Sequence, residues 1–292
     1  MRIIVLAGGG MLGHKMWQGL SAYFKDTYVT LRKTRSHYDQ TGLFQSNQVI
    51  DNLDLADFKK LNHILDEVNP DVIVNCAGVT IRSKEGEKVI ASVNINSLLP
   101  HHLLAWCKKK GARVIHFSTV CVFNGVKGGY TEENLPDAQD LYGRTKTLGE
   151  LYDEQALTLR SSFIGREIEG KAELLEWFLA QRGRQIKGYR QAIFTGVTTK
   201  VMVDLTRDLI RKFPKLSGLF HIASEKLSKY ELLLLMKEAF KVNIDIAPED
   251  NYVCKRDLID TKFKTTTGLI CPNWQEMMAD IAKDPILYDS WR

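Results

Sequence analysis

Short apolar runs alternate with amphipathic stretches along the first half of the chain. The runs have the length of buried strands, and the stretches between them carry apolar residues at helical spacing. The strands predicted in this way are residues 3–7, 27–31, 70–78, 112–119 and 157–162. The helices predicted are residues 12–24, 57–68, 90–109 and 142–155.

This alternation predicts an α/β fold in which parallel strands form a Rossmann-type, doubly wound sheet. Right-handed crossovers place the carboxyl ends of the strands along one edge, where ligands bind. Beyond residue 165 the regular alternation ends. The pattern there predicts a helix and an exposed turn within 173–189, a strand at 218–224, a helix at 229–240 and an irregular tail. We therefore expect a sheet domain of residues 1–165 with about 192–224, and a smaller C-terminal substrate lobe of about 166–191 with 225–292.

The composition excludes several classes of protein. The chain has 292 residues with a net charge of +5, and this surplus is too small and dispersed to indicate a nucleic-acid partner. Its five cysteines are odd in number and lack C-x-x-C spacing, which indicates unpaired thiols in a reducing compartment. The seven histidines do not cluster with cysteines or acids, so no metal site is expected.

No apolar run reaches the 18 residues of a membrane span, so no membrane partner is expected. The first apolar run, residues 3–7, is too short for a signal peptide and reads better as a buried strand. We expect a cytoplasmic protein, and the sequence leaves a homodimer open.

A glycine-rich turn follows the first predicted strand, in "RIIVLAGGGMLGHKM". A strand, a tight turn and a helix place backbone N–H groups and the positive end of a helix dipole against a phosphate. Gly8, Gly10 and Gly13 form G-x-G-x-x-G, while Ala7, Gly10 and Gly13 form G-x-x-G-x-x-G with alanine in the first place. In either register the turn predicts a dinucleotide site in the sheet domain.

Two cations follow the second predicted strand, about twenty residues after the turn. NAD binders tend to place an acid there for the ribose hydroxyls, but this chain has Arg32 and Lys33. Cations suit a 2′-phosphate, so NADPH is favoured as the cofactor, with NADH as the alternative.

A tyrosine and a lysine four residues apart open another predicted helix. The spacing of Tyr142 and Lys146 puts both side chains on one face. A neighbouring ammonium lowers the pKa of a phenol and makes it usable in proton transfer. Ser118 and Thr119 end the strand upstream, where a hydroxyl can hydrogen-bond a substrate carbonyl. Together with the glycine turn, these residues indicate a catalytic site.

In this order, the motifs resemble those of the extended short-chain dehydrogenase/reductases, and most of all the dTDP-4-dehydrorhamnose reductase group. The matching stretches are "NPDVIVNCAGVT", "FSTVCVFNGVKGGYTEEN", "YGRTKTLGE" and "LRSSFIGRE", and "LDL" at 53–55 fits the stretch that contacts adenine. The resemblance is strong over residues 2–167 and loose beyond. It aligns the turn with G-x-x-G-x-x-G, so that Ala7 replaces the family's glycine and the pyrophosphate is expected over residues 10–12.

The resemblance implies an NADPH-dependent reductase acting on the 4-keto group of a nucleotide-linked 6-deoxysugar, for surface polysaccharide biosynthesis. Tyr142 would protonate the incipient alkoxide, Lys146 would hold the nicotinamide ribose, and Thr119 would orient the keto oxygen. Asn96 matches the family's helix asparagine, which is thought to aid the proton relay. The cofactor-binding residues implied are Gly8, Gly10, Met11, Leu12, Gly13, Arg32, Lys33, Asp54, Leu55, Ala77, Gly78, Tyr142 and Lys146.

The substrate side departs from the group's pattern. The group usually reads S-T-D-Y-V-F, and this chain has Val120 and Cys121 in place of the acid and the tyrosine, so a different nucleotide sugar is plausible. Arg256 is the candidate for the diphosphate and Trp177 for a wall of the pocket. An epimerase of the same superfamily stays an alternative; a dehydratase is disfavoured without the acid. The regulatory subunit of methionine adenosyltransferase also resembles this group, so a non-catalytic role is the third reading.

Overall fold

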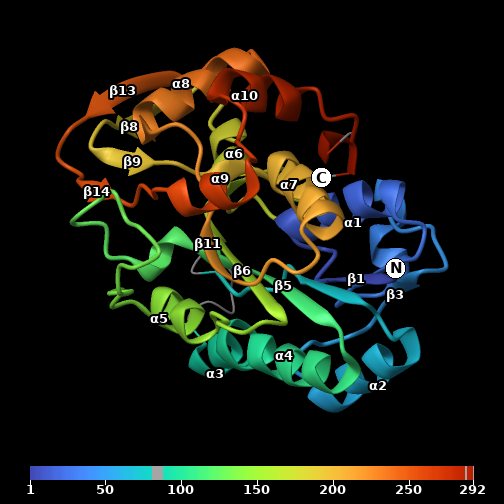
Figure 1. Ribbon diagram of the computed structural model, residues 1–292. Helices are drawn as coiled ribbons and strands as arrows, with labels where there is room; N and C mark the ends of the chain where they lie inside the picture. Colours follow the sequence, from blue (N-terminus) through green and yellow to red (C-terminus); the bar gives the residue numbers. More distant parts are fainter. Residues whose placement is uncertain (81–87, 287, 292) are drawn as a thin grey trace.

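Seven parallel strands form the central sheet of the computed structural model, which describes residues 1–80, 88–286 and 288–291 (Figure 1). Their order is β11-β6-β5-β4-β1-β2-β3, so the direction of winding reverses between β1 and β4. Ligands bind at such a switch point, beyond the carboxyl ends of the strands. The strands are β1 Ile3–Leu6, β2 Thr27–Thr30, β3 Val49–Ile50, β4 Val72–Asn75, β5 Arg113–Thr119, β6 Ala156–Ser161 and β11 Gly218–His221.

Helices cover both faces of this sheet. On one face, α1 (Met11–Tyr23) packs on α7 (Thr199–Lys212), so closely that a Cβ on Gly19 would lie 2.1 Å from Val203 Cγ1. On the other face lie α2 (Phe58–Val68) and α4 (Leu99–Lys110) (Figure 1). Apolar side chains of both faces bury the strands, which read as nearly continuous hydrophobic runs for this reason.

Most of the chain after β6 lies beside the carboxyl edge of the sheet, although β11 and α7 return to the sheet itself (Figure 1). Short strand pairs, β7 with β10, β8 with β13, and β9 with β12 and β14, are combined there with helices. The strands are β7 Phe163–Ile164, β8 Gln185–Tyr189, β9 Ala192–Phe194, β10 Val197–Thr198, β12 Leu227–Ser228, β13 Asp245–Glu249 and β14 Cys254–Lys255. The helices are α6 Leu174–Leu179, α8 Lys229–Phe240, α9 Thr261–Thr267 and α10 Trp274–Ala282.

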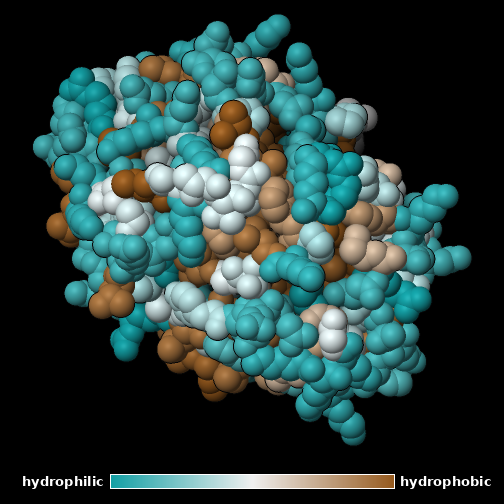
Figure 2. Space-filling view, viewed as in Figure 1, coloured by the Kyte–Doolittle hydropathy of each residue, from teal (hydrophilic) through white to brown (hydrophobic). Residues whose placement is uncertain are grey.

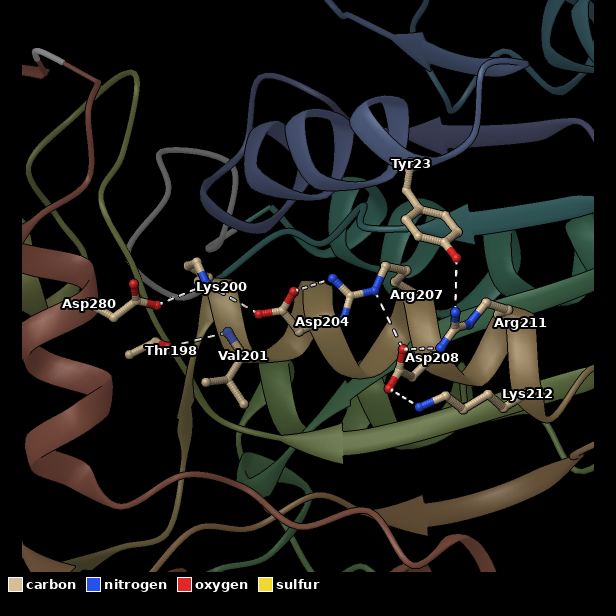
Figure 3. A network of polar contacts seen from close by, with 10 residues as sticks. All are labelled: Tyr23, Thr198, Lys200, Val201, Asp204, Arg207, Asp208, Arg211, Lys212 and Asp280. Atoms are coloured by element: carbon tan, nitrogen blue, oxygen red, sulfur yellow. Dashed lines mark hydrogen bonds and ion pairs between the residues drawn. The ribbon is translucent and has the colours of Figure 1, made fainter.

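The exposed face of α7 carries a ladder of ion pairs (Figure 3). Lys200 lies between Asp204, at 3.3 Å, and Asp280 of α10, at 3.1 Å. At the other end of the ladder, Arg211 donates to the Tyr23 hydroxyl of α1 at 3.0 Å. The ladder therefore joins α7 to helices of both halves of the chain, through side chains that remain in contact with water.

The C-terminal segment returns to the start of α1 (Figure 1). The Tyr288 hydroxyl lies 2.8 Å from His14 Nε2, and Asp284 pairs with Lys15 at 2.8 Å. Asp284 and Tyr288, expected in the smaller lobe, thus contact the first helix of the predicted sheet domain. The division of the chain into two domains stays a prediction.

The predicted fold class is confirmed, and six of the predicted strands, including the one at 218–224, lie in the central sheet. The helix predicted over 142–155 is wrong beyond Leu148, where α5 (Leu141–Leu148) ends. A Cβ on Gly149 would lie 1.9 Å from the Asn96 carbonyl oxygen, and the chain turns away there. The exposed turn within 173–189 contains β8, and the supposedly irregular tail contains β13, β14, α9 and α10. Among the described residues, no helix is both long and apolar enough to cross a membrane.

Candidate active site

The turn between β1 and α1 distinguishes the two glycine registers. Ala7 has a φ of 61°, a left-handed conformation that costs a residue other than glycine about 1–3 kcal/mol. A Cβ on Gly13 would lie 2.0 Å from the Ala7 carbonyl oxygen, so only glycine fits there. Gly8 has no left-handed φ, and its Cβ is excluded instead by Val29 of β2, at 2.3 Å. The geometry therefore favours the register of Ala7, Gly10 and Gly13.

The start of α1 has the features of a phosphate cradle. Gly10 is the N-cap residue, and no side chain caps the helix. The first N–H groups of a helix have no partner within it and carry its positive dipole end. Met11 and Leu12 begin the first turn, and Gly13 keeps the helix close to Ala7. These residues fit the pyrophosphate of a dinucleotide.

Thr119 and Tyr142 meet at the carboxyl end of β5. Thr119 is the last residue of the strand, and Tyr142 lies in the first turn of α5, which Asp140 caps by accepting from the Gly143 N–H at 2.8 Å. A hydrogen bond from the Thr119 hydroxyl favours the ionised Tyr142 and so acts to lower its pKa. The structure therefore brings a strand-end hydroxyl and a phenol together; the catalytic roles of Thr119 and Tyr142 stay predictions.

The pKa of Tyr142 is nevertheless raised above its usual value. Burial is the main cause, and the negative charges that Cys121, Glu173 and Asp140 can carry add to it. We expected Lys146 to lower this pKa, and that expectation is wrong for this structure, because the environment of the phenol is dominated by burial and acidic neighbours. Tyr142 is held as a protonated phenol, which is the form that donates a proton.

Lys146 lies buried beneath this edge of the sheet. Its ammonium donates to the Phe117 carbonyl oxygen of β5 at 2.7 Å and lies 3.4 Å from His116 Nε2. Burial lowers the pKa of Lys146 to about 8, and the charge of Glu150 opposes this shift. Burial, and then the charge of Lys146, also holds the pKa of His116 well below its usual range. The neutral imidazole leaves Lys146 as the cation of this part of the site.

Asn96 lies in a π-helical segment, Val93–Leu98, between α3 (Val89–Ser92) and α4. Its side chain accepts from the Val79 N–H at 2.8 Å and donates to the Val79 carbonyl oxygen at 2.9 Å. It also donates to the Thr145 hydroxyl of α5 at 3.2 Å. Asn96 therefore fixes the loop after β4 against the helix that carries Tyr142; its part in a proton relay stays a prediction.

The residues predicted for adenosine gather at the ends of β2 and β3. The Asn52 N–H donates to the Lys33 carbonyl oxygen at 3.3 Å, and the side chain of Asp54 accepts from the Ala56 N–H at 3.0 Å. Leu55 is buried nearby, and Arg32 is exposed. Ala77 and Gly78 follow β4 on the neighbouring side of the switch point.

The substrate-side candidates are only partly brought together. Arg256, after β14, donates from Nη1 to Cys121 Sγ at 3.3 Å, so it lies beside the site. Its Nε is buried, with no hydrogen-bond partner among the described residues. Val120 is buried in an apolar cluster with Phe123. Trp177 lies on α6 with 37% of its surface exposed.

Sequence reasoning missed the acids that surround the site. Glu173 immediately precedes α6, and its Oε1 accepts a hydrogen bond from the Thr80 hydroxyl at 3.3 Å. The negative charge of Glu173 also acts to raise the pKa of Tyr142. Glu169 reaches Lys33 from the same segment. No pattern along the chain places these residues near the sheet edge. Asp140 had a signal, since an acid just before a predicted helix is a typical N-cap.

A Rossmann-type sheet with a glycine-rich turn after β1, and with threonine, tyrosine and lysine near the end of β5, is typical of the short-chain dehydrogenase/reductase class. Within this class, the chain belongs to the RmlD substrate binding domain family, whose family model matches residues 1–285.

Relatives of this chain have more than one role. It is 24% identical over 255 residues to methionine adenosyltransferase 2 subunit beta of Rattus norvegicus, covering 82% of this chain and 72% of that protein. It is 24% identical over 246 residues to the spore coat polysaccharide biosynthesis protein SpsK of Bacillus subtilis, covering 81% and 78%. Among solved structures, the dTDP-4-dehydrorhamnose reductase of Bacillus anthracis in complex with NADP aligns with a TM-score of 0.78 at 18% identity, over 96% of this chain and 98% of that one.

Proposed function

We propose that this protein is an NADPH-dependent reductase of the 4-keto group of a nucleotide-linked 6-deoxysugar. The observation that carries the proposal is the hydrogen bond between Thr119 and Tyr142 at the sheet edge, with Lys146 buried beneath. The relatives that act in polysaccharide biosynthesis support the substrate class, and the NADP-bound structure supports the cofactor class.

When bound, NADPH would supply the hydride. Thr119 would orient the keto oxygen, and Tyr142, held protonated, would give it a proton as the alkoxide develops. Lys146 would turn from the Phe117 carbonyl to hold the nicotinamide ribose. Burial of the site strengthens each of these polar contacts, because the local dielectric is low.

The proposal is tested by supplying UDP-, dTDP-, GDP- and CDP-linked 4-keto sugars and following NADPH absorbance. Stoichiometric NADPH oxidation with at least one substrate is expected. Conversion of a nucleotide sugar with no net NADPH oxidation would indicate an epimerase instead and would refute the reductase assignment.

A non-catalytic, regulatory role is the second candidate, because the methionine adenosyltransferase beta subunits are relatives over 82% of this chain. It predicts that the protein binds a dinucleotide but turns over none of these sugars. Binding to a methionine adenosyltransferase catalytic subunit, measured by calorimetry, would then support it.

Arg256 is proposed to bind the diphosphate of the substrate. Its replacement by methionine is expected to raise the KM for the nucleotide sugar about 10- to 100-fold, the usual worth of a hydrogen bond to a charged group. The Kd for NADPH should stay within about twofold, because Arg256 lies on the Cys121 side of the site. Arg190→Met is the matched control, since it removes a surface arginine of the same half of the chain that pairs with Asp250. An unchanged KM in Arg256→Met would contradict the role.

Apolar side chains lie exposed at the corner formed by α3 and α5, where Figure 2 shows brown atoms at the lower edge. The exposed apolar residues of α3, of the π-helical segment after it and of α5 are Val89, Ile90, Leu98 and Leu148, which are 48–77% exposed. Contiguous patches of this kind often mark interfaces.

We expect a homodimer that buries this corner, and a double variant, Ile90→Lys with Leu148→Lys, should be monomeric in light scattering. A wild-type monomer would contradict this expectation.

A further inference from the structure

A carboxylate from a distant part of the chain forms an ion pair with Lys33, one of the two cations that follow β2. Glu169 comes from the segment between β7 and α6, far from Lys33 in sequence. Its Oε2 lies 2.9 Å from Lys33 Nζ, and its Oε1 lies 2.5 Å from His37 Nε2. The carboxylate is therefore held by Lys33, which the sequence assigns to the adenosine end of the cofactor, and by His37, which had no predicted role.

Tyr38 connects this cluster to the glycine turn. Its hydroxyl would lie 2.6 Å from a Cβ on Gly9, so it stands directly against the turn. It also makes a side-chain hydrogen bond with Glu169; burial, followed by the charge of Glu169, raises the pKa of Tyr38 to about 12. Glu169 is thus separated from the phosphate turn by a single side chain, on the β2 side where the adenosine ribose of a dinucleotide would lie.

The contacts of Glu169 are those that a phosphomonoester would make. Lys33 donates to one carboxylate oxygen, the His37 ring lies against the other, and Lys33 Nζ and His37 Nε2 lie 3.0 Å apart. Arg32 is close enough for its charge to act on the same Tyr38. A phosphomonoester carries a charge of about −1.5 to −2 at pH 7 against −1 for a carboxylate, so the cations prefer it. Glu169 is 38% exposed in a segment without helix or strand and beside Gly170, whose φ is 86°, so nothing buries it in place.

We propose that Glu169 occupies the position of the cofactor's 2′-phosphate, is displaced when a 2′-phosphorylated dinucleotide binds, and sets the preference between NADPH and NADH. This inference rests on the dinucleotide site of the proposed function. Because only the 2′-phosphate has to displace Glu169, the competition weakens the binding of those ligands alone that carry this phosphate. A dinucleotide without that group leaves Glu169 on Lys33 and His37 and binds through the glycine turn.

The test measures binding rather than turnover. Calorimetric Kd values for NADPH, NADH, 2′,5′-ADP and 5′-ADP are compared between the wild type and Glu169→Gln. We expect the variant to bind NADPH and 2′,5′-ADP about fivefold more tightly, the worth of one exposed ion pair. NADH and 5′-ADP should change by less than about twofold. In Glu169→Gln with Lys33→Gln, the gain for the 2′-phosphorylated ligands should disappear.

Glu249→Gln is the matched control, because it removes another glutamate paired with a lysine, Lys187, at 2.8 Å in the β8–β13 pair. It should leave all four Kd values unchanged. Weaker NADH binding in Glu169→Gln would overturn the inference, since Glu169 would then be a ligand of the ribose hydroxyls. Equal tightening of all four ligands would also overturn it, as a general charge effect. Binding of no dinucleotide by either protein would refute the dinucleotide site and this inference with it.

Discussion

Replacing Tyr142 by phenylalanine is expected to lower kcat for a 4-keto nucleotide sugar by about 10²- to 10⁴-fold, the usual worth of a positioned proton donor. The ring of Tyr142 stays in its buried place, so only the hydroxyl that accepts the hydrogen bond of Thr119 is lost. The Kd for NADPH should change little, because the glycine turn and the cations after β2 are untouched. Stopped-flow absorbance at saturating NADPH measures the effect.

Two companion variants make this result specific. Tyr189→Phe removes a hydroxyl from a partly exposed tyrosine of β8 and should leave kcat unchanged. Thr119→Val should lower kcat less than Tyr142→Phe does, because Thr119 orients the keto oxygen and does not supply the proton. If Tyr142→Phe keeps full turnover, Tyr142 is not the proton donor and the assignment of the site fails.

The sequence predicted the central sheet because its strands are buried on both faces. Such strands are short apolar runs separated by helices, and this pattern needs no knowledge of tertiary contacts. β8 (Gln185–Tyr189) alternates exposed and buried residues, but its partner β13 lies nearly sixty residues further on. The isolated stretch therefore reads as a turn. β3 was missed because it has only two residues, Val49 and Ile50.

The parts of the candidate site that could be predicted are those set by the spacing of residues within one helix or strand. Tyr142 and Lys146 are four residues apart on one helix, and Thr119 ends a strand, so their positions follow from secondary structure alone. The raised pKa of Tyr142 could not be predicted from the sequence, because it depends on burial and on the charge of Glu173, which lies far along the chain. In the same way, the sequence assigned Lys33 to a 2′-phosphate but could not show that the fold pairs this lysine with Glu169, which lies more than a hundred residues further along the chain.

A buried ion pair beneath the site should dominate the stability of the chain. Glu150 and Arg160 are 0% and 1% exposed, and their Oε2 and Nη2 atoms lie 2.6 Å apart. Glu150 Oε1 also accepts from Arg160 Nε and from the Ser118 hydroxyl, each at 2.6 Å. The pair joins the chain after α5 to β6 and to the strand that ends at Thr119, so it supports the catalytic edge.

Glu150→Gln is expected to lower the free energy of unfolding by about 3–5 kcal/mol, because it leaves the Arg160 charge buried without a counter-ion. The loss should appear as a lower urea midpoint with little change in slope. The matched control is Asp204→Asn in the exposed ladder of α7 (Figure 3), which should cost at most about 1 kcal/mol.

The apolar double variant Glu150→Leu with Arg160→Met separates the two contributions to this stability. It removes both charges together, so no uncompensated ion remains, and it should be more stable than Glu150→Gln. Glu150 also raises the pKa of Lys146, so the double variant should hold that pKa below about 8 even where it folds well. A double variant less stable than Glu150→Gln would mean that the hydrogen bonds to Ser118 and within the pair, rather than charge balance, hold this part of the protein together.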